Sequence, residues 1–484
     1  MESSYHYLIL LLVALPAAWL FAKAAQRAFA GPLSKLPGPF LNRWTTWPLK
    51  IAVLCGRRTQ YIHSLHIRYG RAIRITPSEV SVSDLQSLYE INKIGGGFVK
   101  SEWYADFVNE HDGVHGMFSI TNPKEHAERR RHFSRAFATQ SIQDWEPFVQ
   151  SRVQLAISKI KNLGQHGGVD ILAWWSFMTM DVVTKLSFGE TMGTLENGQK
   201  SKFQSDLDES AFWRGLRIEL PWVGAILYRI PLPSLQHLIG SEDRQEVYAK
   251  EVIQQSKRLN ELKGTFFGKV FEEEGMEKSL TDLEIVRDAK AFIIAGTETT
   301  AITLTYFIWV MSKHPDIRRR VQREVDSLSP GFTSQDVYNL PYLQKVIMEN
   351  FRLYTAAPNS LPRMVPKGGK ELGGYFIPEQ TTVSCQAFSL HRDPTIFPDP
   401  LTFDPDRWSN PTRAMRDAMS HFGGGTRACI GKHLALMEIN LGLSHFFREC
   451  PNMEIAPSTT DESMDFDDRF LIKPKGQKCL VVIP

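Results

Sequence analysis

The chain has 484 residues, with 56 Lys and Arg against 53 Asp and Glu and a formal net charge of +3. This balance argues against a nucleic-acid-binding protein, which would be expected to carry a strongly basic surface. The five cysteines are scattered, odd in number and without CxxC spacing. They argue against a disulfide framework or a zinc site and indicate a reducing compartment.

Residues 5–22 form the first notable stretch, YHYLILLLVALPAAWLFA. Its length is close to the minimum for a membrane span. A cleaved signal peptide would begin with positive charge, whereas here Lys23, Arg27 and Lys35 follow the apolar run. We therefore predict an uncleaved, single-pass membrane anchor in residues 1–30, with the rest of the chain in the cytosol.

A proline-rich hinge at residues 31–40, containing Leu36-Pro37-Gly38-Pro39, separates this anchor from the main body of the chain. No linker or repeat divides residues 41–484, so one large domain is predicted there. Alternation in residues 71–82 predicts a β-hairpin. The aromatic and proline-rich patch at 220–233 interrupts a mostly helical region and is interpreted as either a substrate lid or a membrane contact.

Residues 101–117 are aromatic and irregular and include Phe107. A basic helix is predicted next, over residues 123–137, and it carries His126 and Arg130. Taken alone, its arginine cluster is as consistent with a solvated helix face as with a binding site.

A long helix is predicted to begin at the capping box Thr281-Asp282-Leu283-Glu284 and to continue without proline until Pro315. In its middle lies Ala295-Gly296-Thr297-Glu298-Thr299-Thr300, which is poor helix-forming sequence. A local widening of the helix there would make room for a small ligand, with Glu298 and Thr299 handling protons. Taken alone, the segment is more typical of a core helix with back-bonded threonines.

Glu349 and Arg352 form an E-x-x-R pair, which by itself indicates only a weak helical salt bridge. Arg407 follows within Phe403-Asp404-Pro405-Asp406-Arg407-Trp408. Two further hairpins are predicted, one over residues 371–383 and one that pairs residues 470–472 with 479–483.

A glycine-rich loop, Phe422 to Gly431, holds Cys429 directly before a predicted helix. The helix N-terminus and Arg427 are expected to favour a thiolate over a thiol. The glycines allow the backbone to pass close to a flat group. A buried structural cysteine is an equally open interpretation of this loop alone.

The pattern F-x-x-G-x-R-x-C-x-G of this loop resembles the cysteine-ligand loop of the cytochrome P450 family. The A-G-x-[DE]-T-[TS] segment, the E-x-x-R pair and the P-x-R-[FW] segment occur in that family's order. The resemblance covers essentially the whole chain. It implies a mostly α fold with a smaller β region (α+β), forming a single large haem-binding domain behind an N-terminal anchor.

The resemblance implies haem b, an iron protoporphyrin IX, as the cofactor, with Cys429 as the axial ligand to the iron. Within the loop, Phe422 and Gly431 are implied contacts of the cofactor. The haem carboxylates are expected to be held by four basic or hydrogen-bonding residues: Arg427, Arg130, His126 and Arg363. His126 stands where the family has Trp in a W-x-x-x-R pair.

By the same resemblance, Thr299 hydrogen-bonds the oxygen that is being activated, and Glu298 relays protons to it. Glu349, Arg352 and Arg407 are implied to form a buried triad that locks the cysteine loop. The residues implied for the substrate pocket are Ala295, Gly296, Phe107, Pro358 and Leu361.

The implied reaction is insertion of one oxygen atom from O2 into a hydrophobic small molecule, in the style of fungal enzymes that tailor terpenoids, polyketides or alkaloids. Electrons would come from NADPH only indirectly, through a flavoprotein reductase docked near Arg129, Arg131, Arg135 and Lys432. The implied location is the endoplasmic reticulum membrane, with the main domain on the cytosolic face. A haem-thiolate isomerase or dehydratase that needs no O2, and a non-catalytic haem carrier or electron-transfer protein, are the alternatives.

Overall fold

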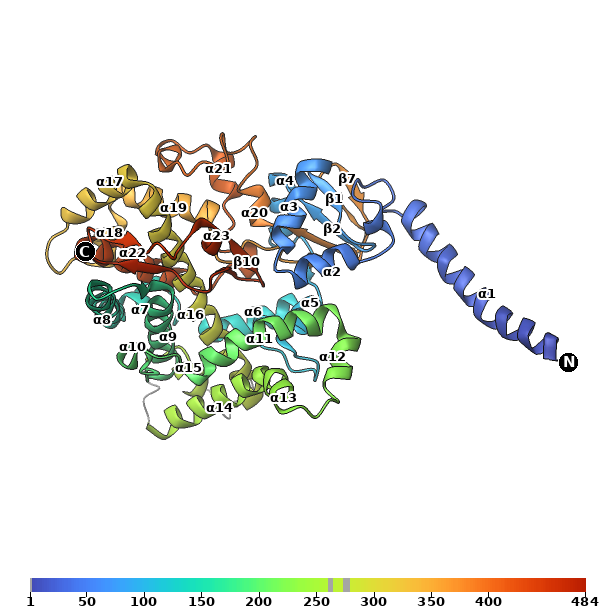
Figure 1. Ribbon diagram of the computed structural model, residues 1–484, viewed down its shortest axis with the longest axis horizontal. Helices are drawn as coiled ribbons and strands as arrows, with labels where there is room; N and C mark the ends of the chain where they lie inside the picture. The colour runs from blue at the N-terminus through green and yellow to red at the C-terminus, as the bar shows by residue number, and fades with distance from the viewer. Residues whose placement is uncertain (1, 260–263, 273–278) are drawn as a thin grey trace. The chain divides into compact units, whose positions relative to one another are not determined.

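The computed structural model describes residues 2–259, 264–272 and 279–484 (Figure 1). The chain folds into two compact units, the first formed by residues 1–101 and 360–390 and the second by residues 102–359 and 391–484. The backbone passes from one unit to the other three times. The predicted single domain of residues 41–484 is thus built from two interleaved units, neither of which is a contiguous stretch of chain.

The first unit is organised around a five-stranded sheet with the order β1-β2-β8-β5-β3. Antiparallel pairing of β1 with β2 confirms the hairpin predicted over residues 71–82. The hairpin predicted over residues 371–383 is shorter than expected. Strand β6 pairs with β7, whereas β8 belongs to the five-stranded sheet. The elements of this unit are α1 (Glu2–Phe29), η1 (Leu41–Arg43), α2 (Trp47–Leu54), α3 (Arg58–Tyr69), β1 (Ala72–Arg74), β2 (Glu79–Val82), α4 (Leu85–Asn92), β3 (Val99–Lys100), β5 (Arg363–Met364), β6 (Lys370–Leu372), β7 (Tyr375–Ile377), β8 (Thr382–Cys385) and α20 (Ala387–Leu390).

Helix α1 contains the predicted anchor segment and ends against the sheet of the first unit. Arg74 on β1 is 1% exposed and donates to the carbonyls of Ala28 and Arg27 over 3.2 and 3.3 Å. These bonds satisfy backbone acceptors that the end of a helix leaves without partners. Among the described residues, the helix long and apolar enough to cross a membrane is α16 (Asp282–Lys313), and 67% of its most apolar stretch is buried in the protein, as in a core helix.

The second unit is mostly helical. Its elements are α5 (Trp103–Val108), α6 (Pro123–Ser134), α7 (Thr139–Gln143), α8 (Glu146–Gln165), β4 (Val169–Asp170), α9 (Ile171–Phe188), α10 (Thr194–Asn197), α11 (Lys202–Glu219), α12 (Pro221–Leu227), α13 (Pro233–Ile239), α14 (Ser241–Leu259), α15 (Gly268–Glu272), α16 (Asp282–Lys313), α17 (Pro315–Asp326), α18 (Ser334–Tyr338), α19 (Pro341–Leu353), η2 (Pro405–Ser409), α21 (Arg413–Ala418), η3 (Gly425–Arg427), α22 (Lys432–Glu449), β9 (Glu454–Ile455), α23 (Asp461–Met464), β10 (Phe466–Asp468), β11 (Ile472–Pro474) and β12 (Leu480–Val482).

Helix α16 is the core of this unit and packs along α9 (Figure 1). It begins where predicted, because the side chains of Thr281 and Glu284 cap each other's backbone N–H groups. Its 32 residues run without interruption, so the expected local widening is wrong. Gly296 explains how closely the two helices approach: a Cβ added there would lie 2.6 Å from Val183 Cγ2 on α9.

Two small sheets close the C-terminal part of the second unit. β12 pairs with β4 and β9, and β10 pairs with β11. The predicted pairing of residues 470–472 with 479–483 is therefore wrong. The pairing of β10 with β11 places residues 469–471 in the turn between these two strands.

Candidate active site

The cysteine loop is a tight turn immediately before α22. The Cys429 N–H donates to the Phe422 carbonyl over 2.9 Å, which closes the loop. Gly423 and Gly425 have φ angles of 70° and 60°. These left-handed conformations are costly for residues with a side chain, so both positions favour glycine. The loop geometry thus agrees with the sequence pattern that predicted it.

Cys429 keeps accessible surface, whereas the other two cysteines of the second unit are fully buried. Desolvation by the protein atoms packed around the sulfur raises the pKa of Cys429, and the Gly431 N–H, Arg130 and Lys432 lower it by less. The expectation that the loop alone favours the thiolate is therefore wrong. A coordinated metal ion deprotonates a thiol outright, so this accessible sulfur suits a metal ligand.

The Ala295–Thr300 segment gives the core helix an accessible stretch. Ala295 is exposed although most of α16 is buried. The Thr299 hydroxyl donates to the Ala295 carbonyl over 2.8 Å. With its proton engaged in this way, the hydroxyl oxygen can still accept a hydrogen bond. The back-bonded threonine that the sequence allowed is thus present, and α16 is accessible at Ala295 without the expected widening.

The structure brings Glu349, Arg352 and Arg407 into one buried cluster. Glu349 pairs with Arg352 at 2.7 Å and with Arg407 at 3.0 Å, and the first two side chains are fully buried. Glu349 also accepts hydrogen bonds from the Trp408 indole and the Asp404 backbone, each over 2.9 Å. A buried carboxylate with this many donors is well compensated for the loss of water.

His391 connects this cluster to the cysteine loop and was not found from the sequence. Burial lowers the pKa of His391 well below its ordinary value, so the ring is neutral. Its Nε2 accepts from the Ser420 N–H over 3.2 Å, which makes Nδ1 the donor to the Arg352 carbonyl over 3.1 Å. The aromatic ring of Phe351 stacks on His421 at a centroid distance of 4.3 Å, beside the same loop.

Two of the predicted carboxylate-binding arginines lie against the cysteine loop. Arg427 donates to the carbonyls of residues 120–121 over 2.7 and 3.1 Å, and Arg130 donates to the Ala428 carbonyl over 2.9 Å. His126 is buried on α6, one turn before Arg130. Arg130 of α6 thus contacts the cysteine loop, and Arg427 of the loop contacts the segment just before α6.

Arg363 and Leu361 belong to the first unit, and Pro358 belongs to the second. Arg363 is buried on β5 and donates to the carbonyls of Leu361 and Pro362. Its role toward the cysteine loop stays a prediction, as do the pocket roles of Leu361 and Pro358.

A family model described as Cytochrome P450 matches residues 37–481. The chain belongs to the cytochrome P450 family. It is 39% identical to the cytochrome P450 monooxygenase tazI of Aspergillus terreus over 464 residues, 94% of each chain. It is 35% identical to the monooxygenase orf2 of Aspergillus niger, again over 94% of each chain, and 35% identical to stcB of Emericella nidulans over 96% of this chain and 90% of the relative.

This P450 is a haem-thiolate monooxygenase, and its residues fit the cofactor of its family. The accessible Cys429 sulfur and the adjacent Arg130 and Arg427 are the donor types that an iron and two carboxylates require. The glycine turn before the sulfur allows the backbone to pass close to a flat group. The fold class predicted from the sequence, mostly helical with a small β region, is confirmed.

Glu298 lies beside Thr299 but is held by an ion pair that the sequence did not predict. Lys473 on β11 contacts the Glu298 carboxylate and also pairs with Asp208 on α11 at 2.8 Å. No local pattern in the sequence links these three residues, because they come from three separate elements.

Glu438 on α22 is a second buried acid that the sequence did not reveal. It is 2% exposed, and burial raises its pKa to about 8 while a hydrogen bond with Thr300 opposes the rise. The carboxyl is therefore protonated at neutral pH. Its hydrogen bond connects the helix after the cysteine loop to the residue that follows Thr299.

Phe107 belongs to an aromatic cluster in the second unit. Its ring lies 5.0 Å from Trp103, 5.9 Å from Phe118 and 4.8 Å from Phe470, measured between centroids. Phe470 has a φ angle of 90°, a strained backbone conformation for a residue with a side chain. The turn between β10 and β11 thus carries strain at the point where its ring joins the cluster.

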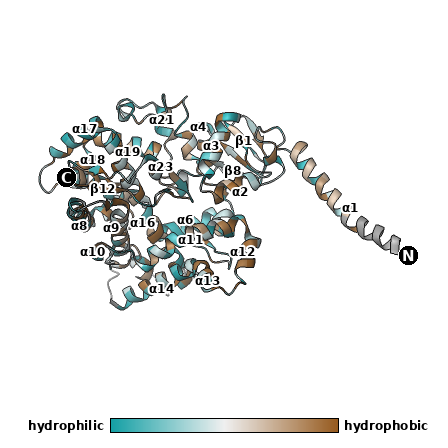
Figure 2. Ribbon diagram, viewed as in Figure 1, coloured by the Kyte–Doolittle hydropathy of each residue, from teal (hydrophilic) through white to brown (hydrophobic). Residues whose placement is uncertain are grey.

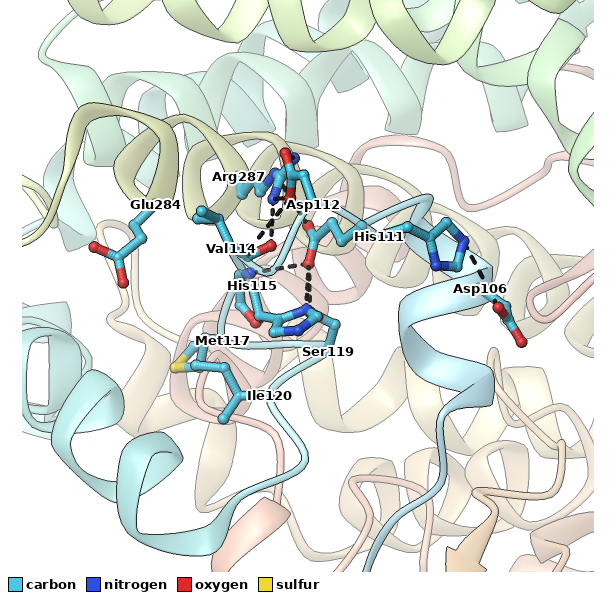
Figure 3. A network of polar contacts seen from close by, with 12 residues as sticks. Asp106, His111, Asp112, Val114, His115, Met117, Ser119, Ile120, Glu284 and Arg287 are labelled. Carbon is cyan, nitrogen blue, oxygen red and sulfur yellow. Dashed lines mark hydrogen bonds and ion pairs between the residues drawn. The ribbon is translucent and has the colours of Figure 1, made fainter.

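The segment between α5 and α6 is fastened to α16 by charged side chains (Figure 3). Arg287 on α16 donates to both oxygens of Asp112 over 2.6 and 2.7 Å, and the Glu110 carboxylate accepts from the Gly116 N–H over 2.9 Å. Arg129 on α6 is only 4% exposed and pairs with Asp288 and Glu284 of α16.

The expectation that Arg129 helps to dock a reductase is therefore wrong, because its guanidinium is buried and already neutralised. Arg131, Arg135 and Lys432 are exposed.

Proposed function

We propose that this P450 uses O2 and reductase-delivered electrons to oxidise a hydrophobic small molecule of fungal secondary metabolism, such as a terpenoid, polyketide or alkaloid. The observation that carries the substrate class is the aromatic cluster of Trp103, Phe107, Phe118 and Phe470. Aromatic side chains bind apolar and ring-bearing ligands through large contact areas. The fungal sources of the relatives support the metabolic setting.

In this proposal Cys429 Sγ would hold the haem iron as a thiolate ligand. Haem, when bound, supplies the redox chemistry of O2 activation. The protein contributes orientation and protons: the Thr299 oxygen accepts a hydrogen bond while its hydroxyl donates to the Ala295 carbonyl. Glu298 delivers protons from its carboxyl oxygen toward Thr299. Ala295 is the accessible surface at which a substrate meets this pair.

The haem carboxylates are assigned to Arg427 and Arg130, with His126 and Arg363 as further donors. Arginine binds carboxylates through paired N–H groups, and the first two guanidinium groups already lie at the cysteine loop. Phe422, the first residue of the loop, makes an edge-on contact with Phe351 at 5.5 Å between ring centroids.

Electrons are proposed to arrive from a membrane-bound, NADPH-dependent flavoprotein reductase. Its acidic surface would dock on the exposed cations Arg131, Arg135 and Lys432. Reversing the charge at all three positions should slow reduction of the haem in stopped-flow measurements, and raising the salt concentration should slow the wild type in the same way. An unchanged reduction rate in the charge-reversed variant would exclude this docking surface.

Helix α1 is proposed to anchor the enzyme in the endoplasmic reticulum membrane with the main domain in the cytosol. The support is the apolar run of residues 5–22, the exposed side chains of Leu15, Trp19 and Phe21, and the cations that follow the run. Helix α12 is largely coloured as hydrophobic in Figure 2. Its side chains Trp222 and Ile226 are 61% and 52% exposed, and we propose that they contact the membrane surface. Deleting residues 1–30 should move the protein from the microsomal pellet to the supernatant, and full retention would exclude α1 as the main anchor.

The function is tested by incubating microsomes that carry the protein with candidate precursors and analysing the products by mass spectrometry. Product should require NADPH, reductase and O2 together, and isotopically labelled O2 should place one labelled atom in it. A product formed without O2 would favour the isomerase or dehydratase alternative. Haem reduction without product from any precursor class would favour the carrier alternative.

A further inference from the structure

Four side chains of alternating charge lead from the surface of the second unit to the acid on α16. Lys200 pairs with Asp208 at 2.6 Å, Asp208 pairs with Lys473 at 2.8 Å, and Lys473 contacts Glu298. The exposed fractions of the Lys200 and Glu298 side chains are 50% and 14%, so the series runs inward. Three of the elements that supply it are distant in sequence, namely α11, β11 and α16.

A cavity of about 70 Å³ follows the same series. Its size admits several water molecules, and water needs polar partners to stay in a buried site. Charged and amide side chains supply such partners here, with apolar residues filling the gaps between them. All four charged side chains of the series line the cavity, and Gln204 and Gln477 add amide groups.

The charges in this series hold Lys473 as an ammonium ion. Although burial opposes it, Glu298 and Asp208 raise the pKa of Lys473 above its ordinary value. Burial alone would raise the pKa of Asp208, but Lys473 and Lys200 outweigh it and lower this pKa. Lys473 therefore stays positively charged between two carboxylates over the whole physiological pH range.

Helix geometry explains what this ammonium ion does to Glu298. Residues three and four apart share a helix face, so Glu298 lies on the same side of α16 as Ala301 and Ile302, which line the cavity. Thr299, one residue on, is turned by about 100° around the helix axis. The ion pair with Lys473 thus keeps the Glu298 carboxylate on the cavity side of the helix.

We propose that Lys473 is a positioning residue that holds the Glu298 carboxylate at the inner end of the cavity, where water replaces each proton that Glu298 passes on. The inference rests on the monooxygenase reaction. In each cycle a hydronium ion in the cavity gives its proton to the Glu298 carboxylate and becomes water, and the carboxylic acid then passes a proton toward Thr299 and returns to the carboxylate. The solvent at Lys200 supplies the next proton, so charge and atoms balance.

The first test measures coupling, which is the share of consumed NADPH that appears in product rather than in hydrogen peroxide. Lys473→Gln should raise the peroxide share at least about threefold, because a misplaced proton donor loses much of its effect. Lys473→Arg, which keeps the charge, should restore most of the coupling. The matched control is Lys475→Gln, since Lys475 pairs with Asp465 on the same hairpin and does not line the cavity.

Epistasis separates positioning from a merely structural role. Adding Lys473→Gln to Glu298→Gln should change the peroxide share no further, because Lys473 acts through Glu298. An additive increase in the double variant, or normal coupling in Lys473→Gln, would overturn the proposal. Absence of product in the wild type would instead count against the proposed function.

Two readouts do not depend on turnover. Melting temperatures of the wild type, the two single variants and the double variant form a cycle in which the double variant should lose less than the sum of the singles. A crystal structure of the enzyme should show ordered water within hydrogen-bond distance of Glu298, and in Lys473→Gln the carboxylate should leave the cavity. Additive melting shifts, or a dry cavity beside Glu298, would overturn the proposal.

Discussion

Replacing Glu349 by Gln should be among the most damaging single changes in this enzyme. The carboxylate receives hydrogen bonds from both Arg352 and Arg407 and from two further donors. Glutamine removes the charge and turns one oxygen into a donor that faces other donors. Breaking a buried ion pair from one side costs about 3–5 kcal/mol, because the opposite charge stays buried without compensation.

The expected loss converts into a measurable shift of the melting temperature. At roughly 2.1 cal/mol/K per residue, a domain of roughly 450 residues has an unfolding entropy of about 0.9 kcal/mol/K. A loss of about 4 kcal/mol therefore lowers the melting temperature by about 4 °C. The haem content should fall as well, because His391 links Arg352 of this cluster to Ser420, two residues before the cysteine loop.

Differential scanning calorimetry and the haem absorbance per protein measure the two effects. Asp406→Asn is the matched control, since the Arg320–Asp406 pair lies nearby with side chains 42% and 54% exposed. Exposed pairs contribute about 0–1 kcal/mol, so this control should melt within about 1 °C of the wild type. A Glu349→Gln variant that melts with the control and keeps its haem would refute the role given to the cluster.

Three further predictions concern α16 and α22. Gly296→Ala should destabilise by about 1–3 kcal/mol, because its Cβ meets the Cγ2 and Cβ atoms of Val183 at 2.6 and 2.9 Å. In a Val183→Gly background, which removes both atoms, the same change should stabilise by up to about 1 kcal/mol. The pKa of Glu438 is about 8 in the folded state and therefore lies above that of the unfolded chain. Between pH 5 and pH 8 the free energy of unfolding of the wild type should thus fall by about 1.4 kcal/mol per pH unit. Glu438→Gln should abolish this decline. Thr299→Ala should keep its haem but divert reducing equivalents to peroxide.

Each of these has a clear contrary result. A destabilising Gly296→Ala in both backgrounds would mean that α9 is not the obstacle. Parallel stability curves for Glu438→Gln and wild type, from urea unfolding across pH 5 to 8, would show that the Glu438 carboxyl is not buried in its neutral form. Tight coupling in Thr299→Ala would remove this hydroxyl from oxygen activation.

Local patterns predicted the elements that organise the site. The capping box at Thr281 and Glu284 marked the start of α16 correctly, because both partners lie within one turn of helix. Gly423 and Gly425 of the cysteine loop have left-handed angles, which is a conformation that the glycine-rich pattern allows. Glu349 and Arg352 are neighbours on one helix, so their pairing too was accessible from spacing.

Contacts between distant segments could not be predicted in this way. Lys473 and Asp208 reach Glu298 from β11 and α11, and the hairpin that carries Lys473 was assigned the wrong partner strand. Short strands carry little periodicity, so their register depends on tertiary packing. Arg129 looked like a surface cation because its partners on α16 lie about 155 residues away in sequence.

The expectation that the loop alone lowers the pKa of Cys429 failed for a different physical reason. The helix terminus and the cations near Cys429 act as expected, but desolvation of the sulfur outweighs them. Desolvation depends on how many atoms surround a group, and a sequence motif does not contain that information.

The most direct test of the central claim is the carbon monoxide difference spectrum of the reduced enzyme. The wild type should give the spectrum characteristic of a thiolate-ligated haem, and Cys429→Ser should abolish it. Cys450→Ser, at a buried position remote from the loop in sequence, should leave it intact. A thiolate-type spectrum that survives in Cys429→Ser would contradict the assignment of the iron ligand and, with it, the site built around the cysteine loop.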